Sequence, residues 1–144
     1  MSEIKKKKIT IPTYRVGEPE PLPLYFEKRP YQGASGRIYP IPYVSSLSDD
    51  KKDYDYDGYV LENEYIRAVL LPELGGKVHC ALDKTNGYDF IYNNKVIKPA
   101  MVGLAGPWVS GGIEFNWPQH HRPTTFMPVE HAEGKLDGKK AVFM

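Results

Sequence analysis

A single dipeptide, Asn86-Gly87, narrows the range of folds open to this chain more than any other part of it. Asn-Gly is typical of two-residue hairpin turns, because both residues tolerate the positive φ angles that such turns require. The β-prone segments on either side, residues 77–82 and 88–92, are therefore predicted to pair as antiparallel strands.

Two further strands are predicted before this hairpin. Tyr59 and Leu61 alternate with polar positions, as expected for a half-buried strand. A tight connection at 63–64 leads to a second β-prone run at 65–71, and a glycine-rich turn at 72–76 leads from there into the hairpin. Because the four strands follow one another in sequence, we predict an antiparallel meander.

The composition of the whole chain favours an all-β fold. Its 144 residues fit one domain. The 13 prolines, 13 glycines and 11 tyrosines disfavour a helical bundle and favour short strands joined by turns. We therefore predict an all-β protein. The arrangement of its strands as an antiparallel β-sandwich is implied by a family resemblance, which two stretches at 71–94 and 103–126 carry.

The N-terminal part has a less regular pattern. A strand is predicted at 9–16, followed by an extended proline-rich segment over 17–42, and residues 45–57 are predicted to form an exposed polar loop. On this basis the single domain divides into N-terminal strands with the proline-rich segment, residues 1–57, and the first part of a sandwich, residues 58–144.

Charge and cysteine content exclude several function classes. The net charge is +1, so no global field attracts nucleic acid or an anionic membrane, and the lysines at 5–8 are interpreted as the solvated start of a strand. Cys80 is the only cysteine, so an internal disulfide framework is excluded. No segment approaches the roughly 20 apolar residues that span a bilayer. We expect a cytoplasmic protein that uses no cofactor or metal and binds neither nucleic acid nor membrane.

The segment 103–128 holds most of the side chains that could bind or transform a ligand. It combines aromatic rings, ionisable groups and glycines, a mixture that a core strand does not need and that a concave site for a polar, ring-shaped ligand would use. The candidate site residues are Trp108, Glu114, Asn116, Trp117, His120, His121 and Arg122. The other two histidines, His79 and His131, are interpreted as structural, one in a strand and one on the surface.

Alternation over 111–117 predicts a strand in this segment. Its apolar face carries Ile113, Phe115 and Trp117, which gives Trp117 an alternative role in the core. Its polar face carries Glu114 and Asn116, which would project together into a groove or into solvent. For Glu114, a functional role and a structural salt bridge remain equal alternatives.

The last residues of the chain, 140–144, are predicted to begin a strand after a hairpin turn at 136–139. A strand that begins there has no return partner, so we expect the natural chain to continue. The alternative is that it pairs back on the hairpin. Half a sandwich leaves an open sheet edge, which favours pairing with a second copy of the chain.

Two stretches, LPELGGKVHCALDKTNGYDFIYNN at 71–94 and GLAGPWVSGGIEFNWPQHHRPTTF at 103–126, resemble a known family. Its members are bacterial proteins with an uncharacterised galactose-mutarotase-like domain, often followed by tetratricopeptide repeats. The resemblance covers about residues 58–144. It implies a partial supersandwich of two large antiparallel sheets. The catalytic glutamate of aldose epimerases comes from a later part of that domain, so the resemblance also implies that this piece alone is inactive.

The resemblance gives the candidate residues roles in carbohydrate chemistry. Interconverting sugar anomers needs an acid and a base, and His120 or His121 could supply the first and Glu114 the second. The indoles of Trp108 and Trp117 could stack on a pyranose, while Asn116 and Arg122 could bind its hydroxyls or an acidic substituent. We therefore expect a carbohydrate-binding or carbohydrate-processing domain. The alternative is a non-catalytic module that positions downstream repeats or binds a protein partner.

Overall fold

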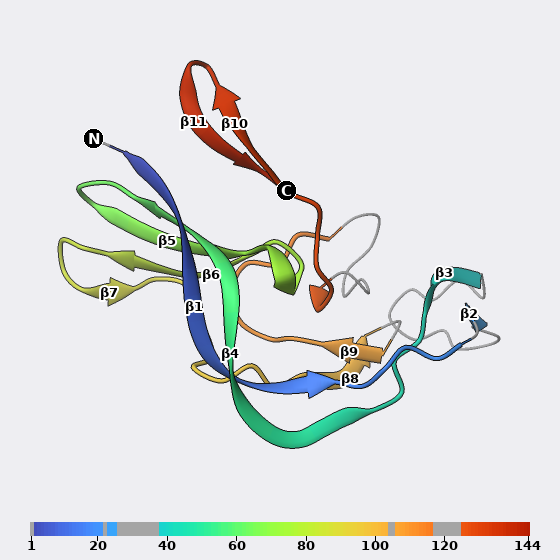
Figure 1. The fold of residues 1–144 in the computed structure, drawn as a ribbon. Helices are drawn as coiled ribbons and strands as arrows, with labels where there is room; N and C mark the ends of the chain where they lie inside the picture. The colour runs from blue at the N-terminus through green and yellow to red at the C-terminus, as the bar shows by residue number, and fades with distance from the viewer. Residues whose placement is uncertain (1, 22, 26–37, 104–105, 117–124) are drawn as a thin grey trace.

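The computed structural model describes residues 2–21, 23–25, 38–103, 106–116 and 125–144 (Figure 1). Over these residues the protein is all-β, with antiparallel sheets and one turn of 3-10 helix, η1 (Pro72–Leu74). The predicted fold class, all-β with antiparallel pairing, is confirmed. No helix in the described ranges has the length and apolarity needed to cross a membrane.

A five-stranded sheet forms the main body of the molecule. Its strands lie in the order β1 (Glu3–Val16), β4 (Leu47–Glu62), β5 (Ile66–Leu71), β6 (Lys77–Asp83) and β7 (Tyr88–Asp89). The meander from β4 to β7 is the one that the sequence predicts, with its turns at the predicted places. The last strand is shorter than the predicted 88–92, because the regular pairing with β6 ends at Asp89, although the Phe90 N–H still donates to the carbonyl of Ala81.

The predicted loop at 45–57 is wrong, since residues 47–57 belong to the long strand β4. Tyr54 and Tyr56 point toward the interior and alternate with aspartates on the outer face. These aspartates face β1 side chains directly: Thr10 donates a hydrogen bond to Asp55, and Lys8 lies 2.9 Å from Asp57. Cross-strand pairs of this kind stabilise an exposed sheet face, so a polar composition did not prevent strand formation.

The strand β1 is also longer than predicted. It begins at Glu3 instead of residue 9 and runs beside β4 along most of its length (Figure 1). The lysines at 5–8 lie exposed on this strand, as the sequence indicates. The predicted division between residues 57 and 58 falls inside β4. Residues 1–57 and 58–144 therefore share one sheet.

Three two-stranded sheets complete the described fold. They pair β2 (Pro23–Tyr25) with β3 (Ile38–Pro42), β8 (Ala100–Gly103) with β9 (Gly106–Trp108), and β10 (Ala132–Leu136) with β11 (Lys139–Phe143). The β10–β11 hairpin projects from the rest of the molecule (Figure 1). The strand predicted to lack a return partner therefore has one, because β11 pairs back on β10.

A single apolar cluster holds the main sheet against the segments that follow it. Its members are buried side chains from β1, β4, β5, η1, the connection before β4 and the connections after β7, namely Ile11, Val44, Tyr56, Val60, Val69, Leu71, Leu74, Ile97, Val109 and Phe126. Burial of this apolar surface is the main contribution to the stability of the fold, at roughly 25 cal/mol for each Å² removed from water. The cluster brings Val109, next to Trp108, against the sheet.

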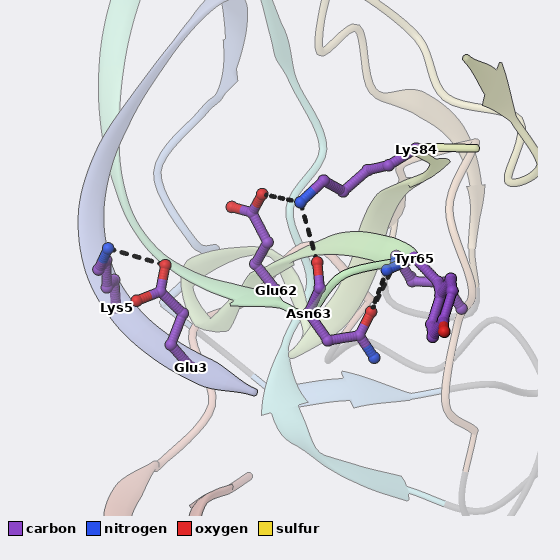
Figure 2. A network of polar contacts seen from close by, with 7 residues as sticks. Glu3, Lys5, Glu62, Asn63, Tyr65 and Lys84 are labelled. Carbon is purple, nitrogen blue, oxygen red and sulfur yellow. Dashed lines mark hydrogen bonds and ion pairs between the residues drawn. The ribbon is translucent and has the colours of Figure 1, made fainter. Parts of the chain in front are cut away.

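A polar network fixes the end of the β4–β5 hairpin (Figure 2). Lys84 donates to Glu62 Oε1 at 2.8 Å and to the carbonyl of Asn63 at 2.9 Å. The Asn63 side chain accepts from the backbone N–H groups of Tyr65 and Ile66. The lysine thereby ties the end of β6 to the β4–β5 connection.

The turn of the β10–β11 hairpin has a left-handed backbone, whose contribution to stability can be measured. Asp137 and Gly138 have φ values of 49° and 74°. A Cβ at Gly138 would meet no atom within 4 Å, so only the backbone conformation opposes a side chain there. We expect Gly138→Ala to lower the free energy of unfolding by about 1 kcal/mol, measured by denaturant unfolding. Gly138→Asn should lose less of the free energy of unfolding, because asparagine tolerates the left-handed backbone conformation. Equal losses in Gly138→Ala and Gly138→Asn would contradict this expectation.

Candidate functional site

The described part of the predicted site is built around a tryptophan and a glutamate. The indole Nε1 of Trp108 donates a hydrogen bond to Glu114 Oε2 at 2.7 Å. Trp108 ends the strand β9 and Glu114 follows a pair of glycines, and both side chains are half-buried. The short bond to a carboxylate fixes the plane of the indole and the position of the acid together.

A buried lysine lies beneath this pair. Lys77 begins β6 and is 2% exposed, and its Nζ donates to the carbonyls of Val109 and Gly111, each at 2.9 Å. Burial lowers the pKa of Lys77, while the negative charge of Glu114 opposes that shift. The lysine therefore holds the backbone that joins Trp108 to Glu114 and places a positive charge near the acid.

A buried histidine follows on the same face of β6. His79 is 8% exposed, and its pKa is lowered to about 4, first because burial disfavours the charged ring and then because of the positive charges of Lys77 and Lys95. The imidazole is therefore neutral at pH 7. A neutral imidazole has one nitrogen that accepts a hydrogen bond and one that donates.

Close backbone contact fastens the segment before Glu114 to β6. Ile113 and Val78 exchange two backbone hydrogen bonds, of 2.9 and 3.2 Å. Gly112 has a φ of 75°, and a Cβ there would lie 2.5 Å from the carbonyl oxygen of Val78. Only glycine permits this approach, so the position of Glu114 depends on it.

The predicted strand at 111–117 does not form within its described residues. The pairing with β6 is a single bridge at Ile113, because the glycines before it turn the chain. The predicted apolar face is also wrong: Ile113 and Phe115 are 45% and 61% exposed. On the predicted polar face, Glu114 is half-buried and Asn116 is exposed. The carboxylate turns inward because Trp108 and the Lys77 charge stabilise it there.

The structure brings together two of the predicted site residues. Trp108 and Glu114 are in contact, with Trp108 at the end of the strand β9. Asn116 is exposed nearby in sequence. The other predicted residues, Trp117, His120, His121 and Arg122, lie outside the described residues. Within the described ranges, no three His, Cys, Asp or Glu side chains are grouped so as to hold a metal ion.

Comparison with known families places this site in a defined family. Residues 34–143 match the model of a domain of unknown function, DUF5107. The chain belongs to the DUF5107 family. The matched range contains Lys77, His79, Trp108 and Glu114, so the whole described site lies within the DUF5107 domain. No solved structure matches the chain.

The candidate site in this DUF5107 domain includes two residues, Lys77 and His79, that were not predicted from the sequence as site residues. Lys77 opens a strand after a glycine-rich turn, where a lysine is usually solvated, and His79 was interpreted as structural. One signal could have found them. Alternation places Lys77 and His79 on the same face as Ala81, which is buried. Polar residues in phase with a buried alanine indicate a polar cluster facing inward.

Proposed function

We propose that this DUF5107 domain binds a carbohydrate and has a galactose-mutarotase-like character, as the resemblance in the sequence implies. The observation that supports the proposal is the hydrogen bond from Trp108 to Glu114. An indole held in a fixed plane offers an apolar surface to the C–H face of a sugar ring. A carboxylate fixed at its edge accepts hydrogen bonds from sugar hydroxyls.

Processing of the sugar is the finer form of this proposal. Anomer interconversion moves one proton onto the ring oxygen and takes another from the anomeric hydroxyl. Glu114 would take the hydroxyl proton, and His120 or His121 would protonate the ring oxygen. Trp117 would add a second stacking surface, and Asn116 and Arg122 would bind hydroxyls. The same proposal includes a cytoplasmic location for the protein and tetratricopeptide repeats that follow the domain.

Binding to a panel of monosaccharides tests the proposal. In saturation-transfer NMR and calorimetry on the full-length protein, Glu114→Gln is expected to weaken binding at least about tenfold, because a neutral amide is a weaker acceptor. Trp108→Phe keeps an aromatic surface and loses the donor, so it should weaken binding less than Trp108→Ala. His120→Ala should reduce turnover more than affinity if this residue is the acid.

The matched control is Tyr88→Ala, which removes an aromatic ring that is 65% exposed on β7. It should leave sugar binding unchanged. Failure of the folded wild-type protein to bind any sugar would refute the proposal, and so would equal affinity of wild type and Glu114→Gln.

A protein-contact module is the second candidate function. It is favoured by the exposed apolar side chains around β7, where Tyr88, Phe90 and Tyr92 are 65%, 45% and 75% exposed. Such a surface suits a protein partner or the positioning of downstream repeats. Pairing of two copies along the sheet edge at β7 belongs to this alternative. Absence of sugar binding together with loss of self-association in Tyr88→Ala/Tyr92→Ala would favour it.

A further inference from the structure

A separate cavity of about 190 Å³ lies between the end of β1, the middle of β4 and η1. Neither Trp108 nor Glu114 lines it. Liquid water takes about 30 Å³ per molecule, so this volume corresponds to roughly six waters, the size of a small organic molecule. The cavity is therefore large enough for a ligand of its own.

The inner wall of the cavity is apolar. Leu74, Ile97, Val109 and Phe126 line it, and each is less than a tenth exposed. These side chains come from four places in the sequence and belong to the main apolar cluster. A ligand that reaches this wall must present an apolar group, because a polar one would lose its hydration without a partner.

Two tyrosines form the side of the cavity between β1 and β4. Tyr54 and Tyr56 contact each other edge to face, with ring centroids 4.7 Å apart. Thr13 donates to the carbonyl of Ile11 at 2.9 Å, so its hydroxyl accepts from Tyr56 at 3.0 Å. The hydroxyls of Thr13 and Tyr56 are thus already engaged, and the charged groups of the cavity are left to select a ligand.

The positive group is Arg15, at the exposed end of β1. Its guanidinium lies over the ring of Tyr54, 4.9 Å from the centroid. Within the described part of the chain it forms no ion pair, so no carboxylate there neutralises it. A guanidinium over an aromatic ring keeps its N–H donors for other partners, and their planar arrangement suits a carboxylate.

The negative group is Glu73, in η1, on the hydroxyl side of Tyr54. Its Oε2 accepts from the Tyr54 hydroxyl at 3.0 Å, and its Oε1 accepts from the backbone N–H of Asp57 at 2.7 Å. The bond to Glu73 raises the pKa of Tyr54, so the phenol stays a donor at neutral pH. Each carboxylate oxygen has a second lone pair, so Glu73 can still accept from a ligand cation.

We infer that this cavity binds a small zwitterion with an apolar side chain, that is, a free α-amino acid of the size of leucine or phenylalanine. The Arg15 guanidinium receives the α-carboxylate, Glu73 receives the α-ammonium, and the side chain packs on the buried wall. The argument is charge complementarity. At the face of Tyr54 the cavity has a cation that forms no ion pair with any described residue, and at the Tyr54 hydroxyl it has a fixed anion. The inference is independent of the carbohydrate proposal.

Calorimetry with L-phenylalanine on the full chain tests the inference. Saturable binding is expected in the wild type. Arg15→Gln and Glu73→Gln should each weaken it at least about tenfold, since each removes one charge-assisted contact. Arg67→Gln, which changes an exposed arginine on β5 away from the cavity, should not change it. Circular dichroism confirms folding, and Arg15, being exposed, can be replaced without disturbing the core.

Ligands that lack one charge complete the test. N-acetyl-L-phenylalanine has no ammonium group, and L-phenylalanine methyl ester has no carboxylate, so both are expected to bind at least about tenfold more weakly than L-phenylalanine. Glycine, which lacks the apolar group, should also bind more weakly. Absence of saturable binding by the folded wild type would overturn the inference. Equal affinity for L-phenylalanine and either blocked form, or for wild type and Arg15→Gln, would also overturn it.

Discussion

Lowering the pH from 7 to 4 is expected to reduce the free energy of unfolding by about 3 kcal/mol through His79 alone. The pKa of His79 is lowered from 6.5 to about 4 in the folded protein. Between these values the unfolded chain binds the proton and the folded protein does not, so stability is complete above pH 6.5 and is lost as the pH falls toward 4. At about 1.4 kcal/mol per pKa unit, the full shift from 6.5 to about 4 is worth about 3.5 kcal/mol, of which about 3 kcal/mol is lost by pH 4.

The measurement is urea unfolding at intervals between pH 4 and pH 7, for wild type and His79→Gln. Carboxylates whose pKa values are lowered by their partners, such as Asp57 and Glu62, also lower stability in acid. They act equally in both proteins, so the difference between the two curves isolates His79. The control His131→Gln changes an exposed histidine, and its free energy of unfolding should depend on pH as that of the wild type does. Parallel curves for wild type and His79→Gln would show that the ring takes up a proton as easily as in water.

Replacing Lys77 by methionine is expected to lower the free energy of unfolding by about 2 kcal/mol. The substitution keeps the length of the side chain and removes the donor to the carbonyls of Val109 and Gly111. A buried carbonyl left without a partner costs about 1–3 kcal/mol. Relief of the burial of a charged amine offsets part of this cost. The net effect is therefore smaller than the loss of two charged hydrogen bonds.

Denaturant unfolding and hydrogen exchange together test this expectation. Exchange of the Gly112 and Ile113 amides, which bond to Tyr92 and Val78, should accelerate in Lys77→Met. The control Lys51→Met removes an exposed lysine on β4 and should leave both stability and exchange unchanged. Unchanged exchange at these amides in Lys77→Met would mean that the lysine does not hold this backbone in place.

The meander could be predicted from the sequence because its signals are local. Gly87 in one turn and Gly75 and Gly76 in the other have positive φ angles, which few residues other than glycine adopt. Period-two alternation fixes the direction of the side chains between these turns. Within 45–57 the strand β4 was not predicted from the sequence, because a run of charged residues is also typical of an exposed loop. The alternating Asp and Tyr of 53–57 form a strand only because β1 supplies partners for the aspartates.

The amino-acid sequence by itself determined the all-β class, the order of the central strands and the presence of Trp108 and Glu114 in one segment. These properties follow from backbone preferences and from neighbours along the chain. Only the tertiary structure decided that Glu114 turns inward to Trp108 and that Lys77 and His79 are buried. The direction of a side chain after paired glycines, and the pKa of a buried base, depend on groups that are distant in sequence. Such groups meet only when the chain is folded.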